Sequence, residues 1–338
     1  MKTARQIFLL TFLITTTFFL MRCGENKKGT ENTSATGSSE NSNEADTLFA
    51  APDTAQIPND KFGAEVRYGR ELMLNTAYYI GPDGVAGKYL GNKMNCTNCH
   101  MEAGTKPFAF NLMLSHLQYP QYRAREAKVL SLAERVNNCV MRPHSGRPLP
   151  LDSKEMIAFL SYLKWINSQL KDKKARGLEM PEFKFPNRAA DPEKGAALFA
   201  QHCTRCHGEN GQGQMDSLNI TYKYPPLWGP SAYQPGSSMH RVIKQARWLK
   251  ANMPQDLAKW YKPILTDEEA FDIAAFVNDD RIHTRPNPKT FDYPFPGEKA
   301  IDYGKGPFAD TFSEAQHKFG PYLPIIDYWK AKGWKPGY

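Results

Sequence analysis

Two copies of a short cysteine motif constrain this 338-residue chain more than any other feature. The first copy is Cys96-Thr97-Asn98-Cys99-His100, and the second is Cys203-Thr204-Arg205-Cys206-His207. The pattern Cys-x-x-Cys-His is typical of c-type haem attachment, in which both thiols form thioethers with the haem and the histidine binds the iron. Zinc binding and a redox disulfide are the alternatives, but two copies, each preceded by a predicted helix, favour haem. We therefore expect two covalently attached haem c groups, with His100 and His207 as proximal iron ligands.

The N-terminus predicts export from the cytoplasm. Two cations precede an apolar run from Ile7 to Met21, which has the length of a signal-peptide core and is shorter than the roughly 20 residues that span a bilayer. Cys23 follows at once, in a context that resembles a bacterial lipoprotein processing site, although Arg22 stands where such sites carry a small residue. We expect a signal peptide at residues 1–22, lipidation of Cys23 and a lipid-anchored protein in the periplasm. Ordinary cleavage and an uncleaved anchor are the alternatives.

Composition divides the rest of the chain into a tether, two domains and an extension. The tether is rich in Ser, Thr, Asn, Glu and Gly, which predicts disorder. A polar stretch with Pro181 and Pro186 predicts a linker between the domains near residue 180. The C-terminal part is rich in Pro, Gly and aromatic residues without a helical period, so we expect an irregular wrap that bridges both domains. The expected bounds are 23–60 for the tether, 61–180 and 181–290 for two cytochrome c-like domains, each with one haem, and 291–338 for the extension.

Each predicted domain consists of a helix, a haem motif, irregular loops and a final helix, which gives a mainly α fold class. A glycine lies within the first helix of each half, at Gly69 and Gly195, where it is costly unless something packs closely against it. In small c-type cytochromes, which this arrangement resembles, such a glycine lets the first helix cross tightly against the last. The expected helices cover 61–77, 152–170, 191–199 and 270–277, the last opened by a capping box at Thr266-Asp267-Glu268-Glu269.

The iron of each haem needs a sixth ligand or an open site, and the second half offers a methionine. Met253 stands about 46 residues after His207 and just ahead of the last helix, where small c-type cytochromes place a distal methionine. We expect Met253 to be this ligand. A His/Met iron usually has a raised potential, which suits an electron relay. Weaker candidates are Met215, Met239 and His240, because most methionines fill cores.

In the first half, spacing does not choose among the possible distal ligands. Cys139 stands out because it is the one cysteine outside the leader and the two motifs. A thiolate is an anionic, strong donor that lowers the iron potential, and off the metal it is a nucleophile. A buried, inert cysteine is the other interpretation. The candidates are Met101, Met113, His116, Cys139, Met141, His144 and Met156.

The charge balance limits the kinds of partner. The formal net charge is +8, and the excess of Lys and Arg falls outside residues 23–60, which are acidic. Part of this excess balances haem propionates, and the rest suits a small anionic substrate or an acidic redox partner. No basic blocks are interleaved with stacking aromatics, which argues against nucleic acid.

Several stretches of the chain carry a family resemblance: Gly91-Asn92, 119–125 (YPQYRAR), 134–142 (ERVNNCVMR), 146–150 (GRPLP), Glu155-Met156, Asn252-Met253-Pro254, 270–277 and 312–321 (FSEAQHKFGP). They closely resemble the dihaem thiosulfate dehydrogenases, and the resemblance covers roughly residues 61 to 325. The stretch around Cys139 is its most specific part. A related stretch occurs in the cysteine-ligated haem subunit of the thiosulfate-oxidising multienzyme system, which is the nearest competitor.

The resemblance implies that Cys139 is both the distal ligand of the first haem and the catalytic residue. Two thiosulfate ions would be joined to tetrathionate through an adduct on Cys139, with the reverse direction left open. The two electrons would pass through both haems to a soluble c-type cytochrome or a similar acceptor. Two dianions must meet in one pocket, so cationic donors are required, and Arg125, Arg135 and Arg142 match family positions. Each arginine has an alternative as a propionate partner or a surface charge.

One position departs from the family pattern. The family commonly has serine four residues after the cysteine, whereas this chain has Pro143. The lost hydroxyl removes a possible donor to the substrate, and proline stiffens the loop. Two other functions compete with thiosulfate oxidation: an electron-transfer dihaem cytochrome without its own substrate, and a carrier-dependent haem subunit of a sulfur-oxidation system.

Overall fold

The computed structural model of the protein describes residues 48–287 and 292–334. The predicted signal peptide, Cys23 and the predicted tether up to residue 47 lie outside these ranges. Within the ranges, no helix combines the length and the apolar character that crossing a membrane requires.

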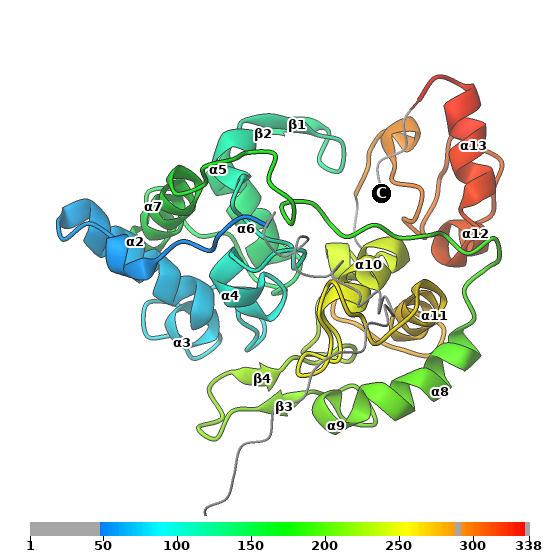
Figure 1. The fold of residues 1–338 in the computed structure, drawn as a ribbon, viewed down its shortest axis with the longest axis horizontal. Coiled ribbons are helices and arrows are strands. Elements are labelled where there is room, and N and C mark those ends of the chain that lie inside the picture. Colours follow the sequence, from blue (N-terminus) through cyan, green and yellow to red (C-terminus); the bar gives the residue numbers. More distant parts are fainter. Residues whose placement is uncertain (1–47, 288–291, 335–338) are drawn as a thin grey trace, which may run out of the picture. The chain divides into compact units, whose positions relative to one another are not determined.

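Helices make up most of the regular structure (Figure 1), which confirms the predicted mainly α fold class. Two short antiparallel strand pairs accompany them, β1 with β2 and β3 with β4. The α-helices are α2 (Lys61–Leu74), α3 (Thr76–Ile80), α4 (Met101–Gly104), α5 (Ser115–Gln118), α6 (Leu132–Met141), α7 (Lys154–Ser168), α8 (Pro192–His202), α9 (Thr204–His207), α10 (Val242–Asn252), α11 (Asp267–Val277), α12 (Glu314–Phe319) and α13 (Leu323–Ala331). The strands are β1 (Gln121–Arg123), β2 (Lys128–Leu130), β3 (Gln214–Met215) and β4 (Tyr222–Tyr224). The 3-10 helices are η1 (Thr54–Gln56), η2 (Cys96–Asn98), η3 (Ser238–His240) and η4 (Pro296–Glu298).

Gly69 and Gly195 lie where the first helix of each half crosses the last. In the first half α2 packs against α7, and in the second α8 packs against α11. A Cβ atom on Gly69 would lie 2.1 Å from the carbonyl oxygen of Ala158, and one on Gly195 would lie 2.0 Å from that of Asp272. These oxygens belong to helix backbone and cannot give way, so only glycine permits such close crossings. The predicted role of both glycines is confirmed.

The predicted helices are present, with shifted ends. Helix α2 stops at Leu74, before residue 77, because Asn75 leaves the helical conformation. Helix α7 begins after Ser153, whose hydroxyl accepts a hydrogen bond from a backbone N–H of the first turn. Helix α11 opens with the predicted capping box, formed by Thr266 and Glu269.

Two hydrophobic cores hold these helices. The first core contains Val66, Phe159 and Ile166 from α2 and α7. The second is built around α10 and α11, with Phe271 and Ile273 at its centre. The second core also takes in apolar side chains from the first half, so the halves share an apolar boundary. These side chains belong to Met94, Met101 and Ala109.

The last part of the predicted tether is packed rather than free. Leu48 forms a β-bridge with Arg176, and Phe49 and Ile57 are 7% and 6% exposed in the first core. The apolar side chains that appear at the end of the polar stretch bury enough surface to offset the entropy of ordering. The prediction of disorder up to residue 60 was therefore wrong for residues 48–60.

The C-terminal extension contains two helices that the sequence pattern did not predict. Helix α12 lies at one end of α13 (Figure 1), and α13 contributes Ile325 and Ile326 to the second core. Proline stands in the first turn of α13, where the missing N–H costs nothing. The pattern failed here because both helices are short and lie between glycines and prolines.

The extension also contacts both halves. The backbone N–H of Tyr293 donates a hydrogen bond to the carbonyl oxygen of Arg125 at 2.8 Å. In the second half, Asp302 pairs with the buried Arg241. The Nζ atom of Lys318 lies 2.9 Å from a carboxylate oxygen of Asp280. The contacts of Tyr293 and Asp302 place the extension against the cavity described next, because Arg125, Arg241 and Tyr293 line it.

Candidate functional site

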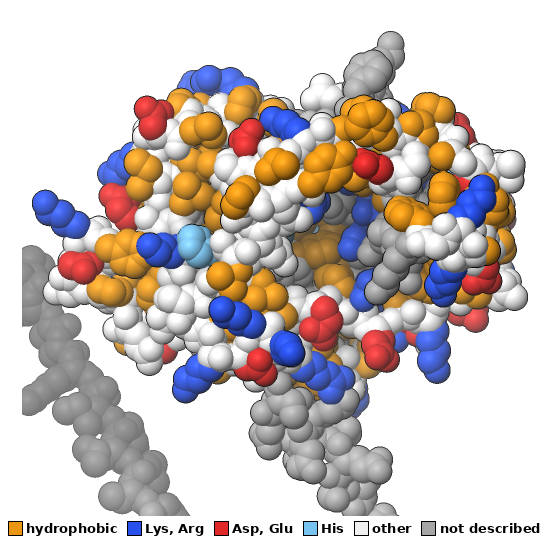
Figure 2. Space-filling view, turned by 90° about the horizontal axis from the view of Figure 1, so that it is seen from above, with side chains coloured by type: hydrophobic (Ala, Val, Ile, Leu, Met, Phe, Trp, Pro, Cys, Tyr) orange, Lys and Arg blue, Asp and Glu red, His pale blue; other side chains and the backbone are white. Residues whose placement is uncertain are grey.

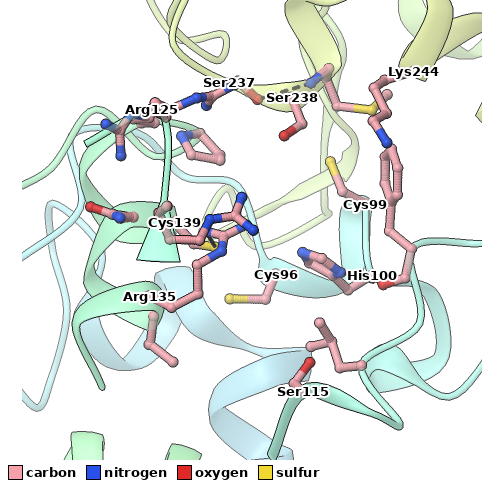
Figure 3. A pocket seen from close by; sticks show the side chains of 18 of the residues that line it. Cys96, Cys99, His100, Ser115, Arg125, Arg135, Cys139, Ser237, Ser238 and Lys244 are labelled. Atoms are coloured by element: carbon pink, nitrogen blue, oxygen red, sulfur yellow. Dashed lines mark hydrogen bonds between the residues drawn. The ribbon is translucent and has the colours of Figure 1, made fainter. Parts of the chain in front are cut away.

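The first haem motif and Cys139 line one cavity of about 850 Å³, within the usual range for cofactor sites. Figure 3 shows Cys139 and Arg135 on one side of the cavity, with Cys99 and His100 on the other. Cys96 begins η2, whereas Cys139 lies near the end of α6. The structure therefore brings together residues that are about 40 positions apart in the sequence.

Both motif histidines are oriented so that one ring nitrogen stays available for a metal. The Nδ1 atom of His100 lies 2.5 Å from the carbonyl oxygen of Phe110, and that of His207 lies 2.9 Å from the carbonyl oxygen of Pro225. A carbonyl can only accept, so each Nδ1 carries the proton and each Nε2 keeps its lone pair. The cysteines in the described ranges form no disulfides with one another. This donor set fits the attachment of haem c.

Cys139 is positioned and charged by its own helix. A capping box between Ser131 and Glu134 starts α6, which places Arg135 one turn before Cys139. The Nη1 atom of Arg135 donates to Cys139 Sγ at 3.1 Å. Burial raises the pKa of the Cys139 thiol, but the Arg135 charge and the neighbouring His100 outweigh it, so the pKa falls to about 6. The thiolate form of Cys139 is therefore accessible at neutral pH.

Of the possible distal ligands of the first half, two line the first cavity. Cys139 and His144 line it, whereas the other candidates do not. His144 is buried, and its Nδ1 lies 3.3 Å from the amide oxygen of Asn92. The candidates outside the cavity are Met101, Met113, His116, Met141 and Met156.

The second haem motif lines a separate cavity of about 780 Å³. Met253 follows α10 directly and lines this cavity with Cys203, Cys206 and His207. Of the weaker candidates only Met239 reaches it, while Met215 and His240 lie outside its lining.

The two cavities are neighbours that share part of their walls. Trp248 of α10 donates from its indole N–H to the carbonyl oxygen of Cys99 at 3.2 Å, which ties the second half to the first haem motif. Asn252 donates to the carbonyl oxygen of Phe108 at 3.0 Å. The residues that line both cavities are Met94, Asn98, Cys99, Tyr233 and Met239.

Comparisons with known proteins agree with this geometry. The family model for cytochrome c matches residues 192–279. A thiosulfate dehydrogenase from Stutzerimonas stutzeri is 35% identical over 242 residues, covering 71% of this chain and 74% of that protein. One from Thiomonas intermedia is 34% identical over 231 residues, covering 68% and 70% respectively. The chain belongs to the thiosulfate dehydrogenase family. It is accordingly an oxidoreductase of the c-type cytochrome class.

A solved member of the family has a similar fold. The thiosulfate dehydrogenase (TsdBA) from Marichromatium purpuratum, in its as-isolated form, aligns with a TM-score of 0.61 at 30% identity. The alignment covers 69% of this chain and 49% of that chain. The protein described here thus spans about half the length of that thiosulfate dehydrogenase.

The three arginines at family positions line the first cavity, but their guanidinium groups have different partners. Arg142 is held by Glu126 at 2.9 Å and by Asp292 at 2.8 Å. Arg125 donates to the carbonyl oxygen of Gly236 and lies 3.7 Å from Asp292. Arg135 instead points its charge at Cys139. The two carboxylates were not foreseen, because Asp292 lies 150 residues beyond Arg142.

Three further cations that were not among the predicted site residues line the first cavity: Arg123, Arg241 and Lys244. Lys244 reaches the cavity from α10 (Figure 3). Burial lowers the pKa of Lys244 to about 8, assisted by the charge of Arg241, so the side chain remains largely charged at neutral pH. The helical spacing of the apolar residues in 242–249 could have predicted α10. Arg241 and Lys244, three residues apart, would then have been expected near each other at the start of this helix. On the face that carries β1, β2 and α13, Lys and Arg side chains stand at the edge of a hollow (Figure 2).

Pro143 lines the first cavity where the family commonly has serine. Its carbonyl oxygen accepts a hydrogen bond from the Asn92 amide at 3.0 Å, which fixes the loop after α6. Its side chain offers no donor to an anion.

Proposed function

We propose that this protein is an exported dihaem cytochrome that oxidises two thiosulfate ions to tetrathionate. One observation carries the proposal: Cys139 shares a cavity with Cys96, Cys99 and His100, and an arginine lies 3.1 Å from its sulfur. A thiolate beside a haem site, surrounded by cations, suits the oxidation of a sulfur dianion. Membership in the thiosulfate dehydrogenase family supports the same substrate.

Cys139 would carry the bond-forming chemistry. Joining its thiolate to the outer sulfur of one thiosulfate forms a sulfur–sulfur bond and releases two electrons. A second thiosulfate then attacks the substrate-derived sulfur of this adduct, which releases tetrathionate and restores the thiolate. Arg135 stabilises the thiolate at the start and at the end of the cycle. No proton is gained or lost, so Cys139 needs no separate general base.

The electrons would leave through the second cavity. A haem bound in each cavity supplies one-electron transfer, with His100 and Cys139 as iron ligands in the first and His207 and Met253 in the second. The shared wall between the cavities supports a direct route from one to the other. The final acceptor would be a soluble c-type cytochrome or a similar redox protein.

Turnover with a small acceptor tests this function. Purified haem-loaded protein should consume two thiosulfate ions and reduce two ferrocenium ions for each tetrathionate formed. Turnover that requires an added sulfur-carrier protein would favour a carrier-dependent haem subunit. No thiosulfate-dependent reduction under any condition would favour an electron-transfer cytochrome without its own substrate.

Lys244 would help to hold the anionic substrate from the side of the second half. We expect Lys244→Met to raise KM for thiosulfate roughly tenfold, the effect of about 1.4 kcal/mol, with kcat little changed. Steady-state kinetics measures both constants. Lys88→Met is the matched control, because Lys88 is exposed and lines neither cavity. An unchanged KM together with a lowered haem potential would assign Lys244 to a propionate instead.

The N-terminus would place the enzyme in the periplasm on a lipid anchor at Cys23. This proposal rests on the apolar leader and on the cysteine that follows it. Cys23→Ala should move the protein from the membrane fraction to the soluble periplasmic fraction. An unchanged distribution between these fractions would exclude lipidation at Cys23 as the anchor.

A further inference from the structure

The loop that joins α10 to α11 exposes large apolar side chains beside the second cavity. Leu257, Tyr261 and Ile264 are 56%, 52% and 40% exposed. The loop begins directly after Met253, and Lys259 within it lines the cavity. Exposed apolar side chains gathered with charged neighbours mark sites of protein contact.

This loop is held in a fixed conformation. The Trp260 ring packs against Phe108, with 5.0 Å between the ring centroids. The Arg176 guanidinium also contacts the Trp260 ring, at 4.6 Å from its centroid. The backbones of Lys259 and Lys262 exchange hydrogen bonds of 3.2 and 2.9 Å across a tight turn. The loop backbone is thus ordered before a partner binds, so its ordering adds no cost to binding.

Positive charge dominates the mouth of the second cavity. Lys106, Lys223 and Lys259 all line it. Lys223 and Lys259 are exposed, and neither forms an ion pair within 4 Å in the part of the chain that the structure describes. The acidic side chains of the lining are Glu102 and Asp256, and Asp256 is already paired with Arg205. Burial lowers the pKa of Lys106, and the nearby Lys259 adds to this effect although Glu102 opposes it.

We propose that this surface docks an electron-accepting protein with an acidic contact face. We call it the loop surface and define it by Lys106, Lys223, Leu257, Lys259, Tyr261 and Ile264. The inference rests on the proposed function, in which the second cavity is the electron exit. Electron-transfer complexes bury little area and dissociate quickly. The rate at which they form depends on charge complementarity between the two contact faces. Exposed apolar side chains next to a lysine-lined cavity meet both needs, because the lysines steer the partner and the apolar residues hold it against the cavity.

Stopped-flow mixing tests the docking surface independently of thiosulfate chemistry. The haem-loaded full-length protein is reduced with dithionite, freed of excess reductant, and mixed with an oxidised soluble c-type cytochrome of negative net charge. Lys223→Glu/Lys259→Glu should lower the second-order rate constant by roughly tenfold or more at low ionic strength. Lys88→Glu/Lys154→Glu carries the same change in charge outside both cavities and should stay within about twofold of wild type. Added salt should slow the wild type and largely spare the double variant.

Two further measurements separate docking from other effects. Leu257→Ser/Tyr261→Ser should weaken binding of the acidic cytochrome in calorimetry while leaving the salt dependence of the rate unchanged. Reduction of ferrocenium, a small cation that needs no docking face, should stay at the wild-type rate in Leu257→Ser/Tyr261→Ser, because neither residue lines a cavity. Lys223→Glu/Lys259→Glu should not slow this reduction, because the reversed charges attract a cation. Equal rate constants for Lys223→Glu/Lys259→Glu and wild type with the acidic cytochrome would overturn the proposal. If the wild type shows no thiosulfate turnover with ferrocenium, the proposed function is refuted. The stopped-flow rate constants with the acidic cytochrome would still test the docking surface.

Discussion

Replacing Cys139 with serine should reduce tetrathionate formation from thiosulfate by roughly 1,000-fold or more, the size of effect seen when an enzyme loses its nucleophile. Serine has nearly the same shape, but its hydroxyl does not ionise near neutral pH and cannot form the sulfur–sulfur bond of the adduct. The Arg135 charge that now faces a thiolate would face a neutral group. The loss should appear in kcat rather than in KM, because the interaction is made during bond formation.

The measurement is turnover with ferrocenium, with haem content determined on the same sample from the absorbance of the pyridine complex. Haem content should be unchanged, because Cys96, Cys99, Cys203 and Cys206 are untouched. Met141→Leu is the matched control, since Met141 lies on the same helix but outside the cavity lining. Turnover at the wild-type rate in Cys139→Ser would contradict the assignment of Cys139 as the catalytic residue.

The second large effect is expected on stability, for Gly69→Ala. The added methyl group would lie 2.1 Å from the backbone oxygen of Ala158 and 2.7 Å from Cβ of Tyr162, so α2 and α7 must move apart. Overpacking of this kind should cost about 3 kcal/mol, because the first core is built on this crossing. The free energy of unfolding, from urea titrations followed by far-UV circular dichroism, measures the cost.

Gly297→Ala is the control for this substitution. A methyl group there would meet only the Ala309 side chain, at 4.0 Å. Its effect should stay within about 0.5 kcal/mol. A similarly small effect for Gly69→Ala would show that the helices can separate at no cost and that the crossing is not constrained as the distances indicate.

Local chemistry allowed much of this structure to be predicted from the sequence. The haem motifs are short and specific. Glycine within a helix is costly, so Gly69 and Gly195 indicated close helix crossings, which the structure has at both positions. The arginine one turn before Cys139 follows from helical spacing alone. These features depend on residues near one another in the chain.

The features that were missed depend on contacts between distant segments. Glu126 and Asp292 neutralise Arg142, and the latter carboxylate comes from the extension. Lys244 enters the first cavity from a helix of the second half. No sequence period encodes which charges meet across a cavity. The tail helices were missed because neighbouring prolines and glycines hide their short period, and the tertiary contacts of Ile325 and Ile326 stabilise α13.

The most direct test of the central claim is the electron paramagnetic resonance spectrum of the oxidised, haem-loaded protein. Thiolate ligation gives low-spin iron a distinctive spectrum, because a thiolate is an anionic and strong donor. We predict one thiolate-ligated low-spin species in the wild type, lost in Cys139→Ser, beside a second species with His/Met ligation that persists. A wild-type spectrum with only His/Met or His/His ligation, unchanged in Cys139→Ser, would contradict the assignment of Cys139 as an iron ligand.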